Sequence, residues 1–454
     1  MRKNLLFLII LLCVSTINYG QTLVTPGDGT LTTAINAAAD GDVLQLFGGA
    51  EYTVTDSSSF AKIIERSLTI EGDPSVTDKP IVKFASSLSE EPKFFLLGNN
   101  ASFTLRSVII DGNVNGVSKA ANVISFDYNA LSNDVSNIKN IRIENCEIKN
   151  TTDNVIHAMN SDMKYRVLID STYIDDCIMH NTGTIIMYKY AGSKFISVTN
   201  STFYDILSYG MRITGTETSG FDETPITIVD HTTWNNIGTT DPREIILCED
   251  GTAQPWTVTN NIFANQVAAP NAKTVVNIKE ITGDVSTITN CAFWNISKVS
   301  WSNSTEGWAH VVTDTVTTDP QFVDAANGDF TIPAGNVLLS FSSTGGAVGD
   351  PRWAVNATSL ERVEELPVEF ALDQNYPNPF NPTTNIVFDI IQSENVTLNI
   401  YDILGREVST LVNERLAAGS YRYEFDAKNL PSGIYIYTIQ AGSKVASRKM
   451  ILMK

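Results

Sequence analysis

The sequence predicts an all-β protein: a right-handed parallel β-helix with an N-terminal capping helix, followed by a small immunoglobulin-like β-sandwich. Three observations predict this fold. A unit of alternating apolar residues recurs through the middle of the chain. Charged residues make up only 18% of the 454 residues, below the ~25% of an ordinary soluble domain, in which helices expose many charges. The chain also holds 39 Asn, an excess that needs a structural reason.

The first residues read as a secretory signal peptide rather than as part of the fold. Arg2 and Lys3 precede the apolar run Leu5–Val14, which is too short to cross a bilayer. Cys13 lacks the small residues that a lipoprotein signal places before its cysteine, so a lipid anchor is the weaker alternative. No later run is long and apolar enough for a helix that spans a membrane, and we expect no transmembrane segment.

A short amphipathic helix is expected next, because Leu31, Ile35 and Ala38 fall on one face and Gly41 stops the pattern. It would cap one open end of the solenoid. The segment 318–353 is expected to cap the other end.

The repeat reads apolar-x-apolar-x-Asn-x-x-aromatic or Ile-x-Asn. Its copies lie at 141–150, 167–176, 196–205, 256–265 and 286–295, with irregular copies at 105–112 and 228–236. Alternation with a period of two excludes helical repeats, and no single coil can bury its apolar face alone. Stacked coils of short parallel strands satisfy both conditions.

The Asn excess follows from the bends between these strands. A tight bend needs a left-handed backbone, which Asn tolerates better than other non-glycine residues. We expect Asn145, Asn200, Asn260 and Asn290 to occupy this bend in successive coils and to hydrogen-bond along the stack. Cys146, Cys177 and Cys291 then become reduced, interior packing groups. These segments together resemble the pectate-lyase-like superfamily of secreted β-helix proteins, a fold that hosts lyases, hydrolases, adhesins and binding proteins.

Between the repeats lie further strand runs, at 154–160, 184–190, 210–215, 244–250 and 274–280. If they stack into one parallel sheet, alternate side chains point outward. The expected binding residues on that face are His157, Tyr188, Tyr190, Asn277 and Lys279, with Lys189 and Arg212 as catalytic candidates and Trp256, Glu244, Glu249 and Asp250 nearby. A mixed polar and aromatic strip of this kind suits an extended extracellular polysaccharide.

Lys189 and Arg212 are 23 residues apart, close to one coil, so they are expected to be neighbours. β-Elimination from a uronic acid needs a base beside a cation that stabilises the enolate. The stretch around them resembles the Lys…Asn-x-Thr-Phe…Arg arrangement of chondroitinase B and the alginate lyases of polysaccharide lyase family 6. The resemblance implies that Lys189 is the base and Arg212 the cation. Exposed charges on a solvated sheet are the alternative.

The sequence departs from that family at two places. Ile213-Thr214-Gly215 follows the arginine where the family has His-Gly, and the residues before Lys189 lack the family's acidic calcium ligands. We therefore predict no required cofactor and no metal site; calcium stays open although its usual ligands are not matched. The four histidines show no metal-binding spacing.

The formal charge of −19 excludes a general nucleic-acid binder, which needs Lys and Arg to neutralise phosphates. The same charge disfavours a polyanionic substrate unless the binding surface is locally basic.

The end of the chain predicts a small all-β module with its own export function. Its motifs are "NYPNPFNPTT", "YDILGREV", "LPSGIYIY" and "KMILMK". They resemble the type A C-terminal sorting domain of the type IX secretion system, which implies transport across the outer membrane and then release or surface attachment, with the secretion machinery as partner. An ordinary immunoglobulin-like module is the alternative. The predicted divisions are a signal peptide (1–20), the β-helix (21–353), a linker (354–365) and the sorting domain (366–454).

Taken together, these features predict a secreted or cell-surface protein that binds or processes a polysaccharide, and whether it is an enzyme stays open. A uronate polysaccharide lyase is one form of this prediction. A non-catalytic adhesin, glycan-binding or structural protein is the other.

Overall fold

The computed structural model describes most of the chain between Gly20 and Met453. The residues outside this description are 1–19, 56–60, 64, 86–92, 115, 119–121, 127–134, 160–165, 190, 215–225, 241–242, 250–255, 267–274, 279–285, 297–309, 355–359, 364–369, 376–377, 392–393, 404, 417–418, 429, 443 and 454. The predicted signal peptide therefore lies almost entirely outside the described residues.

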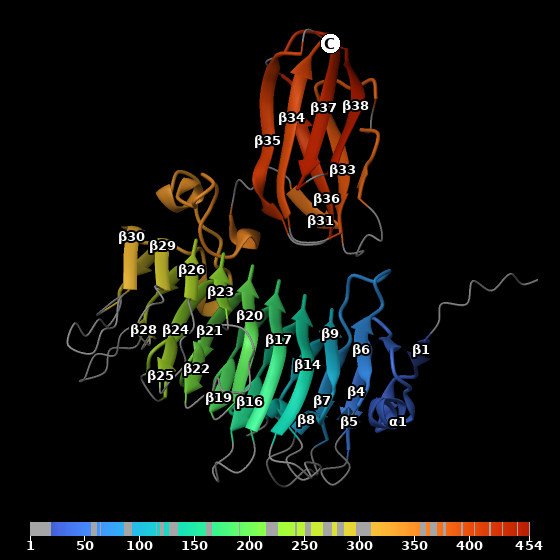
Figure 1. Ribbon diagram of the computed structural model, residues 1–454, viewed down its shortest axis with the longest axis vertical. Helices are drawn as coiled ribbons and strands as arrows, with labels where there is room; N and C mark the ends of the chain where they lie inside the picture. Colours follow the sequence, from blue (N-terminus) through green and yellow to red (C-terminus); the bar gives the residue numbers. More distant parts are fainter. Residues whose placement is uncertain are drawn as a thin grey trace, which may run out of the picture.

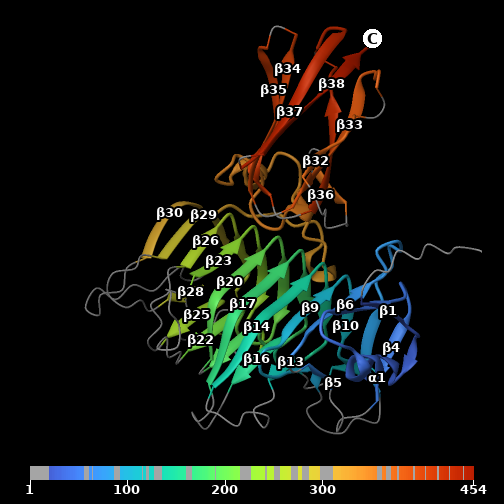
Figure 2. The same ribbon diagram turned by 45° about the vertical axis from the view of Figure 1, so that its right-hand side comes forward.

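Two parallel sheets build the body of the protein, and most of its coils contribute strands to both (Figures 1 and 2). This arrangement confirms the predicted parallel β-helix. The larger sheet contains a row of mostly longer strands, here called the long-strand row: β1 (Gln21–Val24), β3 (Asp42–Leu46), β6 (Ser67–Gly72), β9 (Ser102–Arg106), β14 (Val135–Glu144), β17 (Arg166–Asp175), β20 (Ala191–Thr199), β23 (Ile226–Asp230), β26 (Trp256–Thr259), β29 (Ser286–Trp294) and β30 (His310–Val316).

The same sheet continues around a corner into the short-strand row: β2 (Gly27–Asp28), β4 (Glu51–Val54), β7 (Ile81–Phe84), β10 (Ile109–Asp111), β15 (Glu147–Lys149), β18 (Ile178–His180), β21 (Thr202–Ile206), β24 (Thr233–Ile237) and β27 (Ile262–Ala264). The second sheet holds β5 (Ala61–Ile63), β8 (Lys93–Leu97), β13 (Asn122–Phe126), β16 (Ile156–Met159), β19 (Ile186–Lys189), β22 (Met211–Thr214), β25 (Ile246–Glu249) and β28 (Val276–Ile278). A small hairpin joins β11 (Asn113–Val114) to β12 (Val117–Ser118).

The predicted Asn bends are confirmed. Asn145, Asn200, Asn260 and Asn290 have φ values of 49°, 48°, 56° and 52°, all in the left-handed region. A second set of left-handed residues follows five positions later in each coil: Asn150, Asn181, Asp205, Asn236, Asn265 and Asn295. Strands β15, β18 and β27 therefore lie between two such bends.

Hydrogen bonds along the stack are confirmed in part, because many Asn side chains bond to an acid rather than to another Asn. Asn200 Nδ2 donates to Asp175 Oδ1 at 2.9 Å, and Asn295 Nδ2 donates to Asn265 Oδ1 at 2.9 Å.

One copy of the repeat was placed wrongly. Ile141, which opens the first copy, pairs with Thr172 rather than with Val167, and the left-handed residue of that coil is Asp176. The true unit is 172–181, five residues after the predicted 167–176. The sequence of β17 does not show where the unit begins, because this ten-residue strand carries apolar residues before the unit as well as within it.

The interior is a continuous column of stacked apolar side chains. Phe203, Trp234, Phe263 and Phe293 form one such column, with ring centroids 4.2, 6.4 and 5.3 Å apart along the stack. The described cysteines, Cys146, Cys177, Cys248 and Cys291, are buried and form no disulfide, which confirms the interior packing predicted for the first, second and fourth of them. Burial raises the pKa of the Cys291 thiol to about 12, which suits an inert interior group.

Helix α1 (Thr30–Ala37) is confirmed at the N-terminal end of the stack, with Leu31 and Ile35 buried. Its last carbonyls are satisfied from the solenoid, because the Arg66 guanidinium donates to the carbonyl oxygens of Ile35 and Ala38. The C-terminal end of a helix carries a partial negative charge, so a cation there also interacts favourably with the helix dipole.

The segment 318–353, here called the closing segment, lies along the side of the stack, which corrects the prediction that it caps the second open end. It contains the short helices η3 (Ala325–Asn327), η4 (Val337–Ser340) and η5 (Pro351–Trp353). Its Ile332, Leu338 and Val348 pack on the outward side chains Ile262, Ala264 and Ala292 of the solenoid. At the open end, Val312 continues the interior column of Ile288 and is still 37% exposed.

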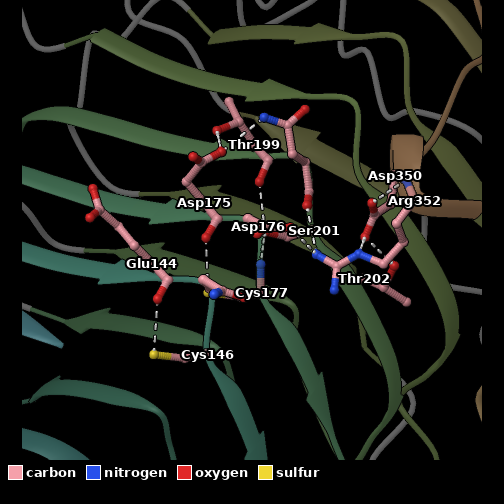
Figure 3. A network of polar contacts seen from close by, with 12 residues as sticks. Glu144, Cys146, Asp175, Asp176, Cys177, Thr199, Ser201, Thr202, Asp350 and Arg352 are labelled. Carbon is pink, nitrogen blue, oxygen red and sulfur yellow. Dashed lines mark hydrogen bonds and ion pairs between the residues drawn. The ribbon is translucent and has the colours of Figure 1, made fainter. Parts of the chain in front are cut away.

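A partly buried polar cluster, here called the clasp, holds this segment in place (Figure 3). Arg352 bridges two carboxylates, with Nε 2.8 Å from Asp350 Oδ2 and one terminal nitrogen 2.8 Å from Asp176 Oδ1. Thr202 Oγ1 donates to Asp350 Oδ2 at 2.7 Å and accepts a hydrogen bond from Trp353 Nε1, also at 2.7 Å. The clasp consists of these five residues.

The C-terminal module has two four-stranded antiparallel sheets and its own core. One sheet contains β31 (Leu360–Val363), β36 (Gly419–Asp426), β33 (Thr383–Ile390) and β32 (Ala371–Leu372). The other contains β35 (Glu407–Leu416), β34 (Glu394–Asp402), β37 (Gly433–Ala441) and β38 (Lys444–Leu452). Strand β31 lies within the predicted linker and pairs with β36, so part of that linker belongs to the sandwich. In the described parts of the chain, no helix is long and apolar enough to cross a membrane.

Candidate functional site

The predicted sheet of candidate residues exists as the second sheet, and its outward face is the candidate site. The register places one side chain per coil in a single outward row: Ser125, His157, Met187, Arg212, Leu247 and Asn277. The alternating inward positions are fully buried, as Ile156, Ile186, Met211, Ile246 and Val276 show. We call the row, together with Lys189, the outer strip.

The structure brings Lys189 and Arg212 to the same face but on a diagonal. Arg212 pairs with Met187, whereas Lys189 pairs with Thr214. With strands ~4.8 Å apart and ~3.3 Å per residue, the two Cα atoms lie about 8 Å apart. Long side chains at this separation can reach one sugar residue from two neighbouring coils.

Several polar atoms of the outer strip are buried without a hydrogen-bond partner. They are Ser125 Oγ, Arg212 Nε and Asn277 Oδ1. The other end of the Asn277 amide donates to Glu244 Oε1 at 3.4 Å. Buried polar atoms in native proteins are normally hydrogen-bonded, so this row offers groups that a polar ligand or water would satisfy.

Two residues that the sequence did not single out contribute to the same region. Tyr209 precedes β22 and is 5% exposed, and its ring lies 5.0 Å from the guanidinium carbon of Arg212. The guanidinium carbon of Arg243, which precedes β25, lies 5.8 Å from the same ring. Both lie just before strands, outside the alternating outward positions that the sequence pattern predicts.

The predicted aromatic part of the strip is wrong for Tyr188. This side chain is fully buried, and its hydroxyl is 2.8 Å from Thr172 Oγ1 inside the solenoid. Burial raises the pKa of Tyr188 well above its usual value. Because side chains alternate along a strand, Tyr188 must point inward if Lys189 points outward. Trp256 is also fully buried, so it cannot stack on a sugar either.

The remaining candidates divide between placed and undescribed residues. His157 and Asn277 are half-buried members of the outer strip, and Glu244 is buried at its edge. Tyr190, Lys279 and Asp250 lie outside the described residues, as does the side chain of Glu249. Within the described ranges, His, Cys, Asp and Glu side chains form no group of three suited to a metal ion.

Comparison with known proteins identifies the end of the chain. Residues 374–453 match the family model of the Secretion system C-terminal sorting domain, and residues 226–353 match a Domain of unknown function (DUF5123). The first match confirms the predicted sorting domain and export by the type IX system to the cell surface or the surroundings. The second runs from the coil of β23 to the end of the clasp.

Solved structures similar to the chain include the PL6 family alginate lyase AlyGC, at 18% identity and a TM-score of 0.49, and an arginine-to-alanine mutant of that enzyme, at 17% and 0.48. Each alignment covers 66% of this chain but only 40% of the enzyme. A likeness at this level concerns the fold and says nothing about activity. Among curated proteins there is no match.

Proposed function

We propose that the protein binds an extended polysaccharide along the outer strip, and that Lys189 and Arg212 act on it by β-elimination. The observation that carries the proposal is their placement: a potential base and a fixed cation project from neighbouring coils on the same face of one sheet. The orphaned polar atoms of Ser125, Arg212 and Asn277 support it, because hydroxyl-rich sugars supply both donors and acceptors.

The chemistry assigns one role to each residue. The Lys189 side-chain amine takes the proton from the carbon next to a uronate carboxylate, and the Arg212 guanidinium stabilises the enolate that forms. The electron pair then makes a carbon–carbon double bond and expels the neighbouring glycosidic oxygen, which takes a proton from water. The products are a shortened chain and one with an unsaturated uronate at its end.

Incubation of the exported protein with alginate, pectin and glycosaminoglycans, with and without calcium, tests this proposal. Release of unsaturated uronate is read as ultraviolet absorbance. Lys189→Ala and Arg212→Ala should abolish the signal, whereas Lys194→Ala, an exposed lysine on the long-strand row, should not. If none of the polysaccharides gives a signal, the lyase role is wrong.

A specific observation favours a non-catalytic, glycan-binding role as the second candidate. On the outward face of the long-strand row, the half-buried rings of Tyr173 and Phe195 lie 5.4 Å apart, with Arg142 4.1 Å from the Tyr173 centroid. Aromatic rings on an open sheet can stack on sugars. Glycan-array binding without turnover, lost in Tyr173→Ala and unchanged in Lys189→Ala, would support this role over the lyase.

Export offers a separate test. Deletion of 366–454 should leave the protein in the periplasm, because the sorting domain is required for passage across the outer membrane. Cell fractionation measures this, and normal surface delivery of the truncated protein would contradict it.

A further inference from the structure

We propose that Cys146 and Cys177 are a disulfide-forming pair, and that the exported protein carries a covalent link between the two coils that hold them. The structure contains both residues as thiols. The link concerns the exported form and is independent of polysaccharide binding by the outer strip. It gives these two cysteines a role beyond the interior packing that the sequence predicts.

The two cysteines occupy the same place in neighbouring coils. Glu147 pairs with Ile178, and this register continued back by one residue sets Cys146 beside Cys177. The strands before the bend pair with the same offset. The backbone N–H of Ile178 donates to the Cys146 carbonyl oxygen at 2.9 Å. Neighbouring parallel strands lie ~4.8 Å apart, within the Cα separation of about 4.4–6.8 Å that a disulfide spans.

The two sulfur atoms lie in equivalent surroundings (Figure 3). Cys146 Sγ lies 3.2 Å from the Glu144 carbonyl oxygen, and Cys177 Sγ lies 3.2 Å from that of Asp175. Cys177 Sγ is also 3.5 Å from the carbonyl oxygen of Ile143, which belongs to the coil of Cys146. It therefore reaches back toward its neighbour, and a hydrogen bond joins the two thiols. Closure needs side-chain rotation and a small approach of the coils, because linked Cβ atoms lie about 3.5–4.5 Å apart.

The oxidant is a small-molecule or protein disulfide, and the step is thiol–disulfide exchange. One cysteine thiolate attacks this reagent, expels a thiolate and forms a mixed disulfide. The second cysteine loses its proton, attacks the sulfur of the first and expels the other thiolate. The pair is oxidised by two electrons with loss of two protons, and the reagent is reduced to two thiols. Because Cys146 and Cys177 are 1% and 0% exposed, the exchange takes place while these coils fold and stack.

The export route supplies suitable conditions. The sorting domain takes the protein to the cell surface or the surroundings, where disulfides persist, unlike in the reducing cytosol. The other two described cysteines lie elsewhere: Cys248 is in β25 of the second sheet, and Cys291 is in β29, several coils further along. A link between Cys146 and Cys177 would tie the coil of Asp176, which Arg352 holds in the clasp, to the coil before it.

The test maps thiols in the protein purified after export. Under denaturing conditions without reductant, N-ethylmaleimide should label Cys248 and Cys291 but neither Cys146 nor Cys177, and after reduction it should label all of them. Cys248 and Cys291 are the matched controls, because they are equally buried. Proteolysis without reduction should also release one linked peptide that contains Cys146 and Cys177 and that separates on reduction.

The variant Cys146→Ser distinguishes this link from any other block of Cys177. In this variant, Cys177 should be fully labelled without reductant. Cys177 that stays unlabelled there would overturn the proposal, because its partner would not be Cys146. Full labelling of Cys146 and Cys177 in the unreduced wild type, or a peptide that links either of them to Cys248 or Cys291, would overturn it as well.

Discussion

The clasp should make the stability of the protein depend on pH through one carboxyl group, that of Asp350. This side chain is fully enclosed between the solenoid and the closing segment, where it contacts Thr202 and Arg352 (Figure 3). Burial raises the pKa of Asp350 from 3.8 to about 6, although the Arg352 guanidinium opposes the shift. The same ion pair raises the pKa of Arg352, which therefore stays charged throughout. Asp350→Asn removes the titration and keeps an oxygen for Thr202.

The sign of the effect follows from which state binds the proton. Between the unfolded pKa and the folded pKa, the folded protein holds a proton on Asp350 that the unfolded chain has lost. The contribution of Asp350 to the free energy of unfolding is therefore fully present below about pH 4 and declines as the pH rises through about 6. A shift of roughly two pKa units corresponds to about 3 kcal/mol.

The measurement is urea unfolding of the full-length wild type and of Asp350→Asn at several pH values from 4 to 7. The free energy of unfolding of the wild type, relative to the variant, should fall by about 2 kcal/mol between pH 4 and 6 and level off near pH 7. Because the wild type and Asp350→Asn share all other titratable groups, the difference between their free energies of unfolding reports the titration of Asp350 alone. A difference that stays constant over this range would refute the reasoning, because it would mean that Asp350 titrates alike in both states.

Three further changes test the packing of the solenoid. Gly210→Ala should lower the free energy of unfolding by about 1–3 kcal/mol, and with it the melting temperature, because the new Cβ would overlap the Trp234 ring. Gly346→Ala is the control, because its Cβ meets only Ser342 Oγ, at 3.4 Å. Tyr188→Phe should lower the free energy of unfolding in urea by about 1–2 kcal/mol, because the Thr172 hydroxyl loses its hydrogen-bond partner. Glycan binding should be unchanged, and altered binding would contradict the interior placement of Tyr188. Asn265→Ala should lower the free energy of chemical unfolding by about 1–2 kcal/mol, because alanine tolerates the φ of 53° poorly, and Asn265→Gly should lower it less. Equal effects of the two changes would show that the left-handed bend is not the reason for asparagine at this position.

The parts of the fold that the sequence predicts are those set by local backbone chemistry. A left-handed bend accepts few residue types, so Asn145, Asn200, Asn260 and Asn290 mark their corners in the sequence itself. Helix α1 is likewise marked by Leu31, Ile35 and a glycine stop. The type IX sorting module was recognised because its motifs follow one another in order along a single segment.

The parts that the sequence does not predict depend on contacts between distant residues. Nothing near Asp350 in the chain indicates that it meets Thr202, so the closing segment was expected at the open end of the stack. The five-residue error at 167–176 has its cause in β17, which buries Val167 and Ile169 before the unit and Thr172 and Ile174 within it, so that only the pairing with Ile141 shows where the unit begins. Tyr209 and Arg243 converge through the stacking of coils, and no spacing within the chain reveals it.

The charge of the protein and the charge of the outer strip act over different distances. With a formal charge of −19, the whole molecule repels an acidic polysaccharide, but salt screens that repulsion beyond a Debye length of about 8 Å at physiological ionic strength. Lys189 and Arg212 would act at contact distance, where a partly buried cation is screened much less. Added salt would therefore relieve the long-range repulsion as well as weaken the local attraction. We therefore expect added salt to weaken binding to the outer strip less than it weakens binding to a surface that is basic throughout. On such a surface there is no long-range repulsion for salt to relieve, so salt only weakens the attraction.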